Sequence, residues 1–96
     1  MPLRVRSELI GSKLHRLLIF QDGQYIGEYE RSQEADIERK KAEIRNAEAE
    51  LLGIYRRHGE FVVRWDGAKR QKSVRVKGTE VGTVPRAAWE RPSWEG

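Results

Sequence analysis

Six basic side chains lie close together in residues 60–79, and they are the clearest chemical signal in the chain. Lys and Arg number 19 and Asp and Glu 15, a formal charge of +4. Residues 60–79 hold six bases against two acids, Glu60 and Asp66, so this segment alone carries a surplus of four. Clustered cations suit phosphate groups, which they bind through charge-assisted hydrogen bonds and counterion release. We therefore predict a nucleic-acid-binding surface formed by Arg64, Lys69, Arg70, Lys72, Arg75 and Lys77.

The same segment, called here the basic hairpin (residues 60–79), alternates as two strands. Apolar residues recur at every second position, which sends the intervening bases to the opposite face. The core positions predicted in this way are Phe61, Val63, Trp65, Val74 and Val76. Lys69, Arg70 and Lys72 fall in the predicted connecting loop, and Trp65 points inward, which makes it a poor stacking residue.

Two questions about the basic hairpin stay open at this level. Arg4 and Arg6 extend its surface if the first strand of the sheet lies beside it. The competing interpretation is that Lys and Arg on an exposed strand only keep that strand soluble and unpaired.

A protein-interaction module, such as an adaptor, inhibitor or assembly subunit, is the alternative function. Ile37 and Ile44 stand seven residues apart on a charged helix, a spacing that would allow a two-helix seam and a homodimer. Trp89 and Trp94 lie in a polar C-terminal segment, and tryptophan is enriched at binding hot spots. We expect Trp89 to fold back onto the sheet, and we have no preference for Trp94.

Catalysis is not indicated. His15 and His58 are the two histidines, and no nucleophile stands beside either of them in the sequence. No carboxylate pair or His/Asp/Glu spacing marks an acid–base couple or a metal site. The chain has no cysteine, which excludes disulfides, thiolate zinc sites and a cysteine nucleophile. We predict a protein that is not an enzyme and has no cofactor.

The strands and the helix predicted to position these residues are separated by clear turn and capping signals. Alternating or continuous apolar runs predict strands at 3–9, 14–20, 24–29, 61–65, 73–77 and 81–84. Asp22-Gly23 predicts a type I′ hairpin turn. A helix of about twenty-five residues is predicted to begin near Ser32, as its N-cap, and to stop at Gly59. The fold class is α+β in the order β-ββ-α-ββ(β): an antiparallel sheet of four to six strands packed on one long helix. Residues 1–84 form the domain, and residues 85–96 form a Trp-containing tail.

A short stretch resembles known DNA-binding domains. Gly27-x-Tyr29 followed by Glu34-Ala35 is similar to the segment of AP2-type and phage-integrase arm-type domains in which the last strand runs into the helix. Those families place three strands before the helix and bind DNA with that sheet. In this chain most of the surplus of basic residues over acidic ones lies after the helix, so no functional residue is transferred.

The composition indicates what kind of protein to expect and where in the cell. With 38% hydrophobic and 35% charged residues, the chain can form a modest core beneath a heavily charged surface. No apolar run reaches transmembrane length, and the N-terminal residues lack the apolar core of a signal peptide. We expect a soluble, cytoplasmic protein with a nucleic acid or another protein as its partner.

Overall fold

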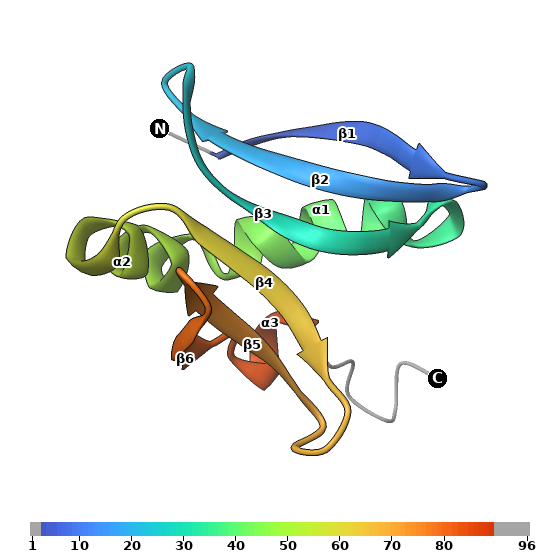
Figure 1. Ribbon diagram of the computed structural model, residues 1–96. Coiled ribbons are helices and arrows are strands. Elements are labelled where there is room, and N and C mark those ends of the chain that lie inside the picture. The colour runs from blue at the N-terminus through green and yellow to red at the C-terminus, as the bar shows by residue number, and fades with distance from the viewer. Residues whose placement is uncertain (1–2, 90–96) are drawn as a thin grey trace.

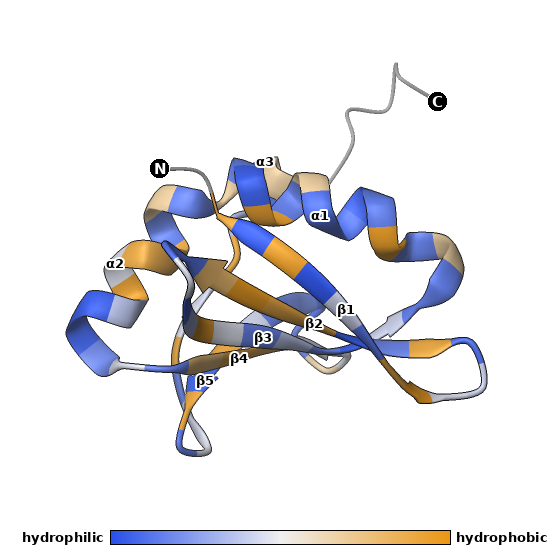
Figure 2. Ribbon diagram, turned by 90° about the horizontal axis from the view of Figure 1, so that it is seen from above, coloured by the Kyte–Doolittle hydropathy of each residue, from blue (hydrophilic) through white to orange (hydrophobic). Residues whose placement is uncertain are grey.

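A six-stranded sheet, open on one face and covered by helices on the other, forms the protein (Figures 1 and 2). The computed structural model describes residues 3–89. The strands are β1 (Arg4–Gly11), β2 (Leu14–Gln21), β3 (Gln24–Gln33), β4 (Phe61–Asp66), β5 (Gln71–Val76) and β6 (Thr79–Thr83). The helices are a 3-10 turn η1 (Glu34–Asp36), α1 (Ile37–Asn46), α2 (Glu48–His58) and the short α3 (Arg86–Trp89).

The strands lie in the sheet in their order along the chain, β1 to β6. Neighbouring strands are antiparallel except for β3 and β4, which are parallel. The α+β class and the strand count are confirmed, but the purely antiparallel sheet that we predicted is wrong. A helical crossover returns the chain to the end of the sheet where β3 began, so the strand that pairs beside β3 must be parallel to it. The sheet therefore consists of two three-stranded antiparallel units joined at one parallel seam.

Tight turns set the register within each unit. Asp22 and Gly23 both have positive φ, 51° and 81°, as the predicted type I′ turn requires. Lys77 and Gly78, with φ of 51° and 84°, make the equivalent turn between β5 and β6. Lys77 is therefore held at the tip of a turn, away from the middle of the strands.

The predicted single long helix is two helices that meet at Ala47. Ala47 has φ −100° and ψ 15°, although hydrogen bonds from Ala47 N to Glu43 O and from Leu51 N to Ala47 O still bridge the junction. The bend lets α1 pack on β3 while α2 packs on β4 and β6, so each helix covers a different half of the sheet. The predicted N-cap at Ser32 is also wrong, because Ser32 lies buried within β3 and caps no helix.

The core lies between the helices and the covered face of the sheet. Its fully buried members come from both units of the sheet and from the two helices, and they include Leu17, Ile19, Ile44, Leu51 and Phe61. At the seam, Gly27 of β3 is paired with Phe61 of β4, whose ring lies against the glycine backbone. The seam is short, since only Gly27–Tyr29 and Phe61–Val63 are paired across it.

Candidate nucleic-acid interface

Beyond the paired residues of the seam, β3 and β4 diverge toward their C-terminal ends (Figure 1). A hollow of about 270 Å³ opens there, lined by Glu30, Arg31, Arg64 and Trp65. A smaller pocket of about 50 Å³ shares the last three of these residues and reaches Lys40 and Lys72. We call this place the β3–β4 cleft. The cleft lies beyond the carboxyl ends of the two parallel strands, which is the end of the strands at which open α/β sheets bind their ligands.

Trp65 is the aromatic wall of the β3–β4 cleft. Its side chain is on the helix-covered face of β4 with Val63, as alternation predicts, but it lies past the end of the core and is 52% exposed, so the prediction of Trp65 as a core residue is wrong. Trp89 of α3 supports it from one side, with the ring centroids 5.9 Å apart and the planes nearly perpendicular. Trp89 is itself fixed by a hydrogen bond from its indole N–H to Val84 O, 3.1 Å. The exposed part of Trp65 is therefore an aromatic surface on a rigid support.

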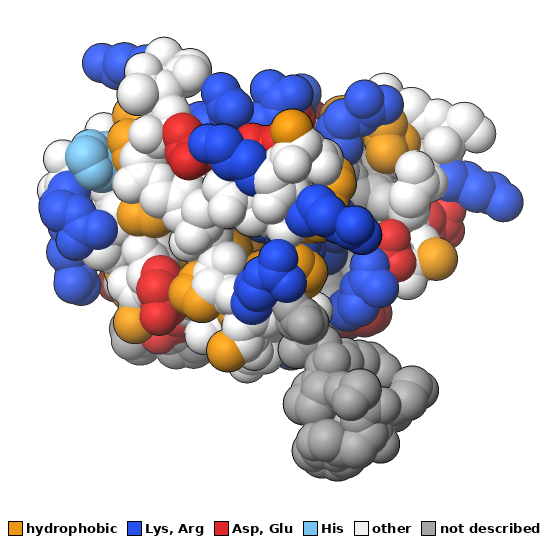
Figure 3. Space-filling view, turned by 90° about the horizontal axis from the view of Figure 1, so that it is seen from below, with side chains coloured by type: hydrophobic (Ala, Val, Ile, Leu, Met, Phe, Trp, Pro, Cys, Tyr) orange, Lys and Arg blue, Asp and Glu red, His pale blue; other side chains and the backbone are white. Residues whose placement is uncertain are grey.

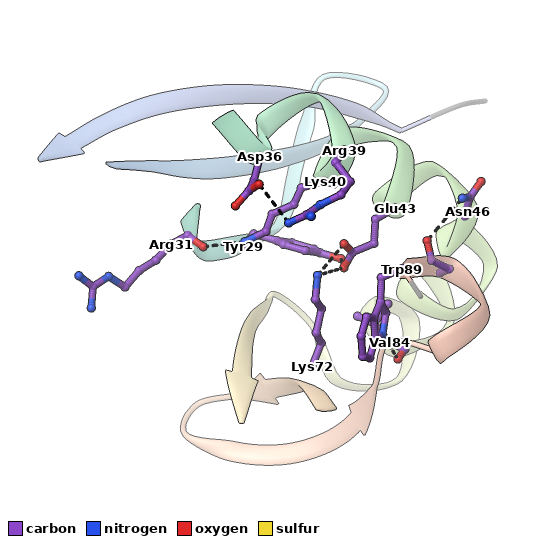
Figure 4. Close-up of polar contacts among 11 residues, drawn as sticks. Tyr29, Arg31, Asp36, Arg39, Lys40, Glu43, Asn46, Lys72, Val84 and Trp89 are labelled. Carbon is purple, nitrogen blue, oxygen red and sulfur yellow. Dashed lines mark hydrogen bonds and ion pairs between the residues drawn. The ribbon is translucent and has the colours of Figure 1, made fainter. Parts of the chain in front are cut away.

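Basic groups surround this aromatic surface. Arg64 lies 3.6 Å from Glu30, and both of these side chains are about half exposed, so the ion pair is weak. Arg31 is exposed, and its guanidinium points away from the buried cluster of side chains (Figure 4). Lys40 of α1 donates a hydrogen bond to Arg31 O, 3.2 Å. Burial and then the neighbouring Lys72 ammonium lower the pKa of Lys40 below its usual 10.5.

Below the β3–β4 cleft, a buried carboxylate joins α1 to both halves of the sheet (Figure 4). Glu43 is 2% exposed and accepts a hydrogen bond of 2.7 Å from the Tyr29 hydroxyl. Lys72 Nζ donates to both Glu43 oxygens, at 2.8 and 2.6 Å, and its ammonium also lies 5.3 Å from the Trp89 ring centroid. These contacts hold β3, α1 and β5 in fixed positions and neutralise the charge of Lys72, which leaves Arg31, Lys40 and Arg64 as the cations of the cleft.

The buried Tyr29 hydroxyl makes stability depend on pH in alkali. Burial, followed by the charge and hydrogen bond of Glu43, raises the pKa of Tyr29 far above its usual 10.0. Above pH 10 the unfolded chain loses this proton and the folded chain keeps it, so the free energy of unfolding should fall as pH rises, by up to about 1.4 kcal/mol per pH unit. Lys40 acts in the opposite direction, but only below 10.5.

Urea unfolding between pH 10.5 and 11.5 measures this effect. We expect Tyr29→Phe to have a shallower fall than the unsubstituted protein over that interval, because phenylalanine has no proton to lose. Equal slopes for the two proteins would contradict the assignment of the alkaline instability to Tyr29.

The six predicted bases of the basic hairpin do not share one face. Arg64 and Arg75 project from the open face, while Lys69 and Arg70 follow β4 in the loop and Lys77 occupies the opposite turn. The prediction of Lys72 in the loop is wrong: β5 begins at Gln71, and alternation places Lys72 on the same face as Val74. In the view from below, Lys and Arg side chains are spread over the surface with carboxylates between them (Figure 3).

Several of these bases already have acceptors. Lys69 lies 3.7 Å from Glu80, and Arg75 donates a hydrogen bond of 3.4 Å to Gly78 O. Glu80 also accepts a hydrogen bond of 2.7 Å from Ser73 on the open face. Arg64, Lys69 and Arg70 lie at the cleft end of β4, whereas Lys77 lies at the far end of β5.

The remaining predicted residues lie elsewhere. Arg4 and Arg6 are on β1, at the opposite edge of the sheet from the basic hairpin, and do not extend it. Ile44 is fully buried and Ile37 packs against the core, so neither forms an exposed seam on the helix. Trp89 folds back against the core as expected, and Trp94 lies outside the described residues.

Sequence reasoning missed Tyr29, Arg31, Lys40 and Glu43. A signal for two of them was available: Lys40, Glu43, Ala47 and Leu51 follow one another at helical spacings of three and four, so they share the face that Leu51 buries. A carboxylate on such a face needs a buried cation, and Lys72 stands two residues before Val74 on the covered face of the sheet. No comparable pattern marks Arg31.

Comparison with known proteins adds no relative: no protein-family model, curated protein or solved structure matches the chain. Within residues 3–89, no three His, Asp or Glu side chains gather as metal ligands would. No helix in the same part of the chain is long and apolar enough to cross a membrane. The fold is that of an α+β protein with a mixed six-stranded sheet, and the β3–β4 cleft is its candidate site.

Proposed function

We propose that this protein is a non-catalytic nucleic-acid-binding protein that holds an unpaired strand in the β3–β4 cleft. The observation that carries the proposal is the half-exposed Trp65 in a hollow lined by Arg31 and Arg64. Unpaired bases can stack on aromatic side chains, whereas the bases of a duplex are stacked on one another and their faces are not accessible. The basic hairpin contributes through its residues at the cleft end of β4.

Each group has a distinct role in the proposed complex. Trp65 stacks on one base, and its rigid contact with Trp89 lowers the entropy lost on binding. Arg31 and Arg64 bind the flanking phosphates, and the Arg64–Glu30 pair is weak enough to be exchanged for a phosphate. Lys69 and Arg70 lie in the loop that follows β4 and meet the next phosphates along the strand. Arg75 and Lys77 are too far along β5 to join this path.

Fluorescence anisotropy with labelled single-stranded DNA, single-stranded RNA and duplex DNA, each over a salt series, tests the proposal. We expect a single strand to bind more tightly than the duplex, with log affinity falling linearly against log salt concentration. Trp65→Ala should weaken single-strand binding by about 1–3 kcal/mol, the usual value of one base–aromatic stack, and Trp65→Phe should retain most of the affinity. Arg31→Ser should reduce the salt slope by roughly 0.7.

Arg56→Ser is the matched control for Arg31→Ser. Arg56 is an exposed arginine at the end of α2, so its loss changes the net charge equally without altering the β3–β4 cleft. Circular dichroism should show all variants folded. Absence of binding to every nucleic acid at low salt would contradict the proposal. Binding to duplex DNA that Trp65→Ala leaves unchanged would exclude the β3–β4 cleft as the binding site.

A further inference from the structure

A second hollow, of about 530 Å³, lies at the β1 edge of the sheet, far from the β3–β4 cleft. Its described lining consists of Leu3, Arg4, Val5, Arg6, Phe20, Gly23, Lys41 and Arg45. We call it the β1 pocket. Four of these eight residues are cations and none is an acid. A volume of this size is in the range of small-molecule sites, and the mixture of apolar walls with a few charged groups is typical of them.

The four cations come from two elements far apart in sequence. Arg4 and Arg6 are two residues apart on β1 and therefore share a face of the strand. Lys41 and Arg45 are four residues apart on α1 and share a face of the helix. Protection of an exposed strand edge explains cations on β1. It does not explain why α1 brings two more to the same hollow.

These charges are poorly compensated inside the protein. Within residues 3–89, the structure records no ion pair for Arg4, Arg6 or Arg45. Lys41 has one, at 3.6 Å from Glu38, an almost fully exposed side chain. Arg6 lies over the Phe20 ring, 5.8 Å from its centroid, which holds the guanidinium at the wall of the pocket. The Glu48 carboxylate accepts a hydrogen bond of 3.0 Å from Leu3 N beside the pocket, so the four cations still outnumber this acid and would attract an anion.

We propose that the β1 pocket binds a small amphipathic anion, in which a phosphate or carboxylate group is joined to an apolar chain. Guanidinium groups bind either head group through paired hydrogen bonds. Leu3 and Val5, on the core side of β1, and Phe20, which is paired with Arg4 and lies on the other side, supply apolar contacts for the chain around the edge of this strand. Arg6 covers one face of the Phe20 ring, which also makes a T-shaped contact with Tyr25, so the ring is already partly occupied as a stacking surface for a nucleobase.

Isothermal titration calorimetry and NMR of the full chain test this site with decyl phosphate and decanoate, both below their micelle concentrations. We expect binding of at least one of them, with amide shifts at Leu3, Val5 and Phe20, and the stronger of the two identifies the head group. Decanol and inorganic phosphate alone should bind much more weakly. Arg4→Ser combined with Arg45→Ser should weaken binding at least about tenfold, as expected for losing hydrogen bonds to a charged group.

Lys13→Ser combined with Arg56→Ser removes the same charge from exposed positions outside the pocket and should leave binding unchanged. Three results would overturn the proposal: no binding of either anion up to about 1 mM, a weak affinity by any standard; decanol binding as well as the anions; or equal affinity in the pocket and control variants. Displacement of decyl phosphate from the pocket by a single-stranded oligonucleotide would also overturn it, in favour of a nucleic-acid surface.

Discussion

Replacing Lys72 by methionine should lower the free energy of unfolding by about 3–5 kcal/mol, the usual cost of leaving one member of a buried ion pair without its partner. Glu43 is 2% exposed, and the Lys72 side chain is 14% exposed. Methionine fills a similar volume but offers Glu43 neither a hydrogen-bond donor nor a positive charge. The Tyr29 hydroxyl, at 2.7 Å, would then be the only remaining donor to that carboxylate among the described side chains. Urea unfolding followed by circular dichroism measures the loss.

A second substitution separates the ion pair from simple packing. Glu43→Gln keeps an oxygen for the Tyr29 hydroxyl and removes the buried charge. Combined with Lys72→Met, it should recover most of the stability, because replacing both members of a buried pair by neutral groups is often close to neutral. If the double variant is as unstable as the sum of the single variants, the two side chains do not interact as the structure describes.

Lys69→Met is the matched control. Lys69 is also a hairpin lysine with a carboxylate partner, but it is 61% exposed and its nitrogen lies 3.7 Å from Glu80. Exposed ion pairs contribute about 0–1 kcal/mol, so we expect little change in stability. The contrast between two lysines three residues apart would show that burial, rather than the loss of a positive charge, determines the effect.

This contrast also explains why the charge pattern of the sequence was a limited guide to the site. Counting charges treats Lys69, Lys72 and Lys77 as equivalent, but strand alternation directs Lys72 into the protein and turn geometry places Lys77 at the far end of β5. The inward direction of Lys72 could have been predicted from the sequence if the strand had been predicted to begin at Gln71. The divergence of β3 and β4 could not, because it depends on how far two strands separated by two helices remain paired.

The strand order, too, could be predicted from the sequence only in part. Local patterns predicted each strand and the Asp22-Gly23 turn, because alternation and turn chemistry are properties of neighbouring residues. The parallel seam follows from the crossover and could have been deduced from the β-ββ-α-ββ(β) order itself. The position of Arg4 and Arg6 at the far edge needed the complete strand order, which no local pattern encodes.

The seam is also where a single methyl group should have its largest effect. A Cβ atom added at Gly27 would lie 2.6–2.7 Å from three ring atoms of Phe61, closer than van der Waals contact permits. Phe61 is fully buried, so its ring cannot turn outward to make room. We expect Gly27→Ala to cost about 3 kcal/mol, the upper part of the range for overpacking a core. This loss would exceed the gain of about 0.4–1 kcal/mol from a less flexible unfolded chain.

Two further variants assign that loss to the collision. Phe61→Leu removes most of the ring from Gly27, so the Gly27→Ala, Phe61→Leu protein should lose less stability than the two single variants added together. Gly53→Ala makes the same change inside α2, where the nearest atom to the new methyl group is the flexible end of Arg57 at 3.4 Å. There we expect a gain of roughly 0.5–1 kcal/mol from helix propensity. Additive losses at Gly27 and Phe61 would mean that the ring does not rest on the glycine, and the parallel seam would then lack the close contact that joins the two halves of the sheet.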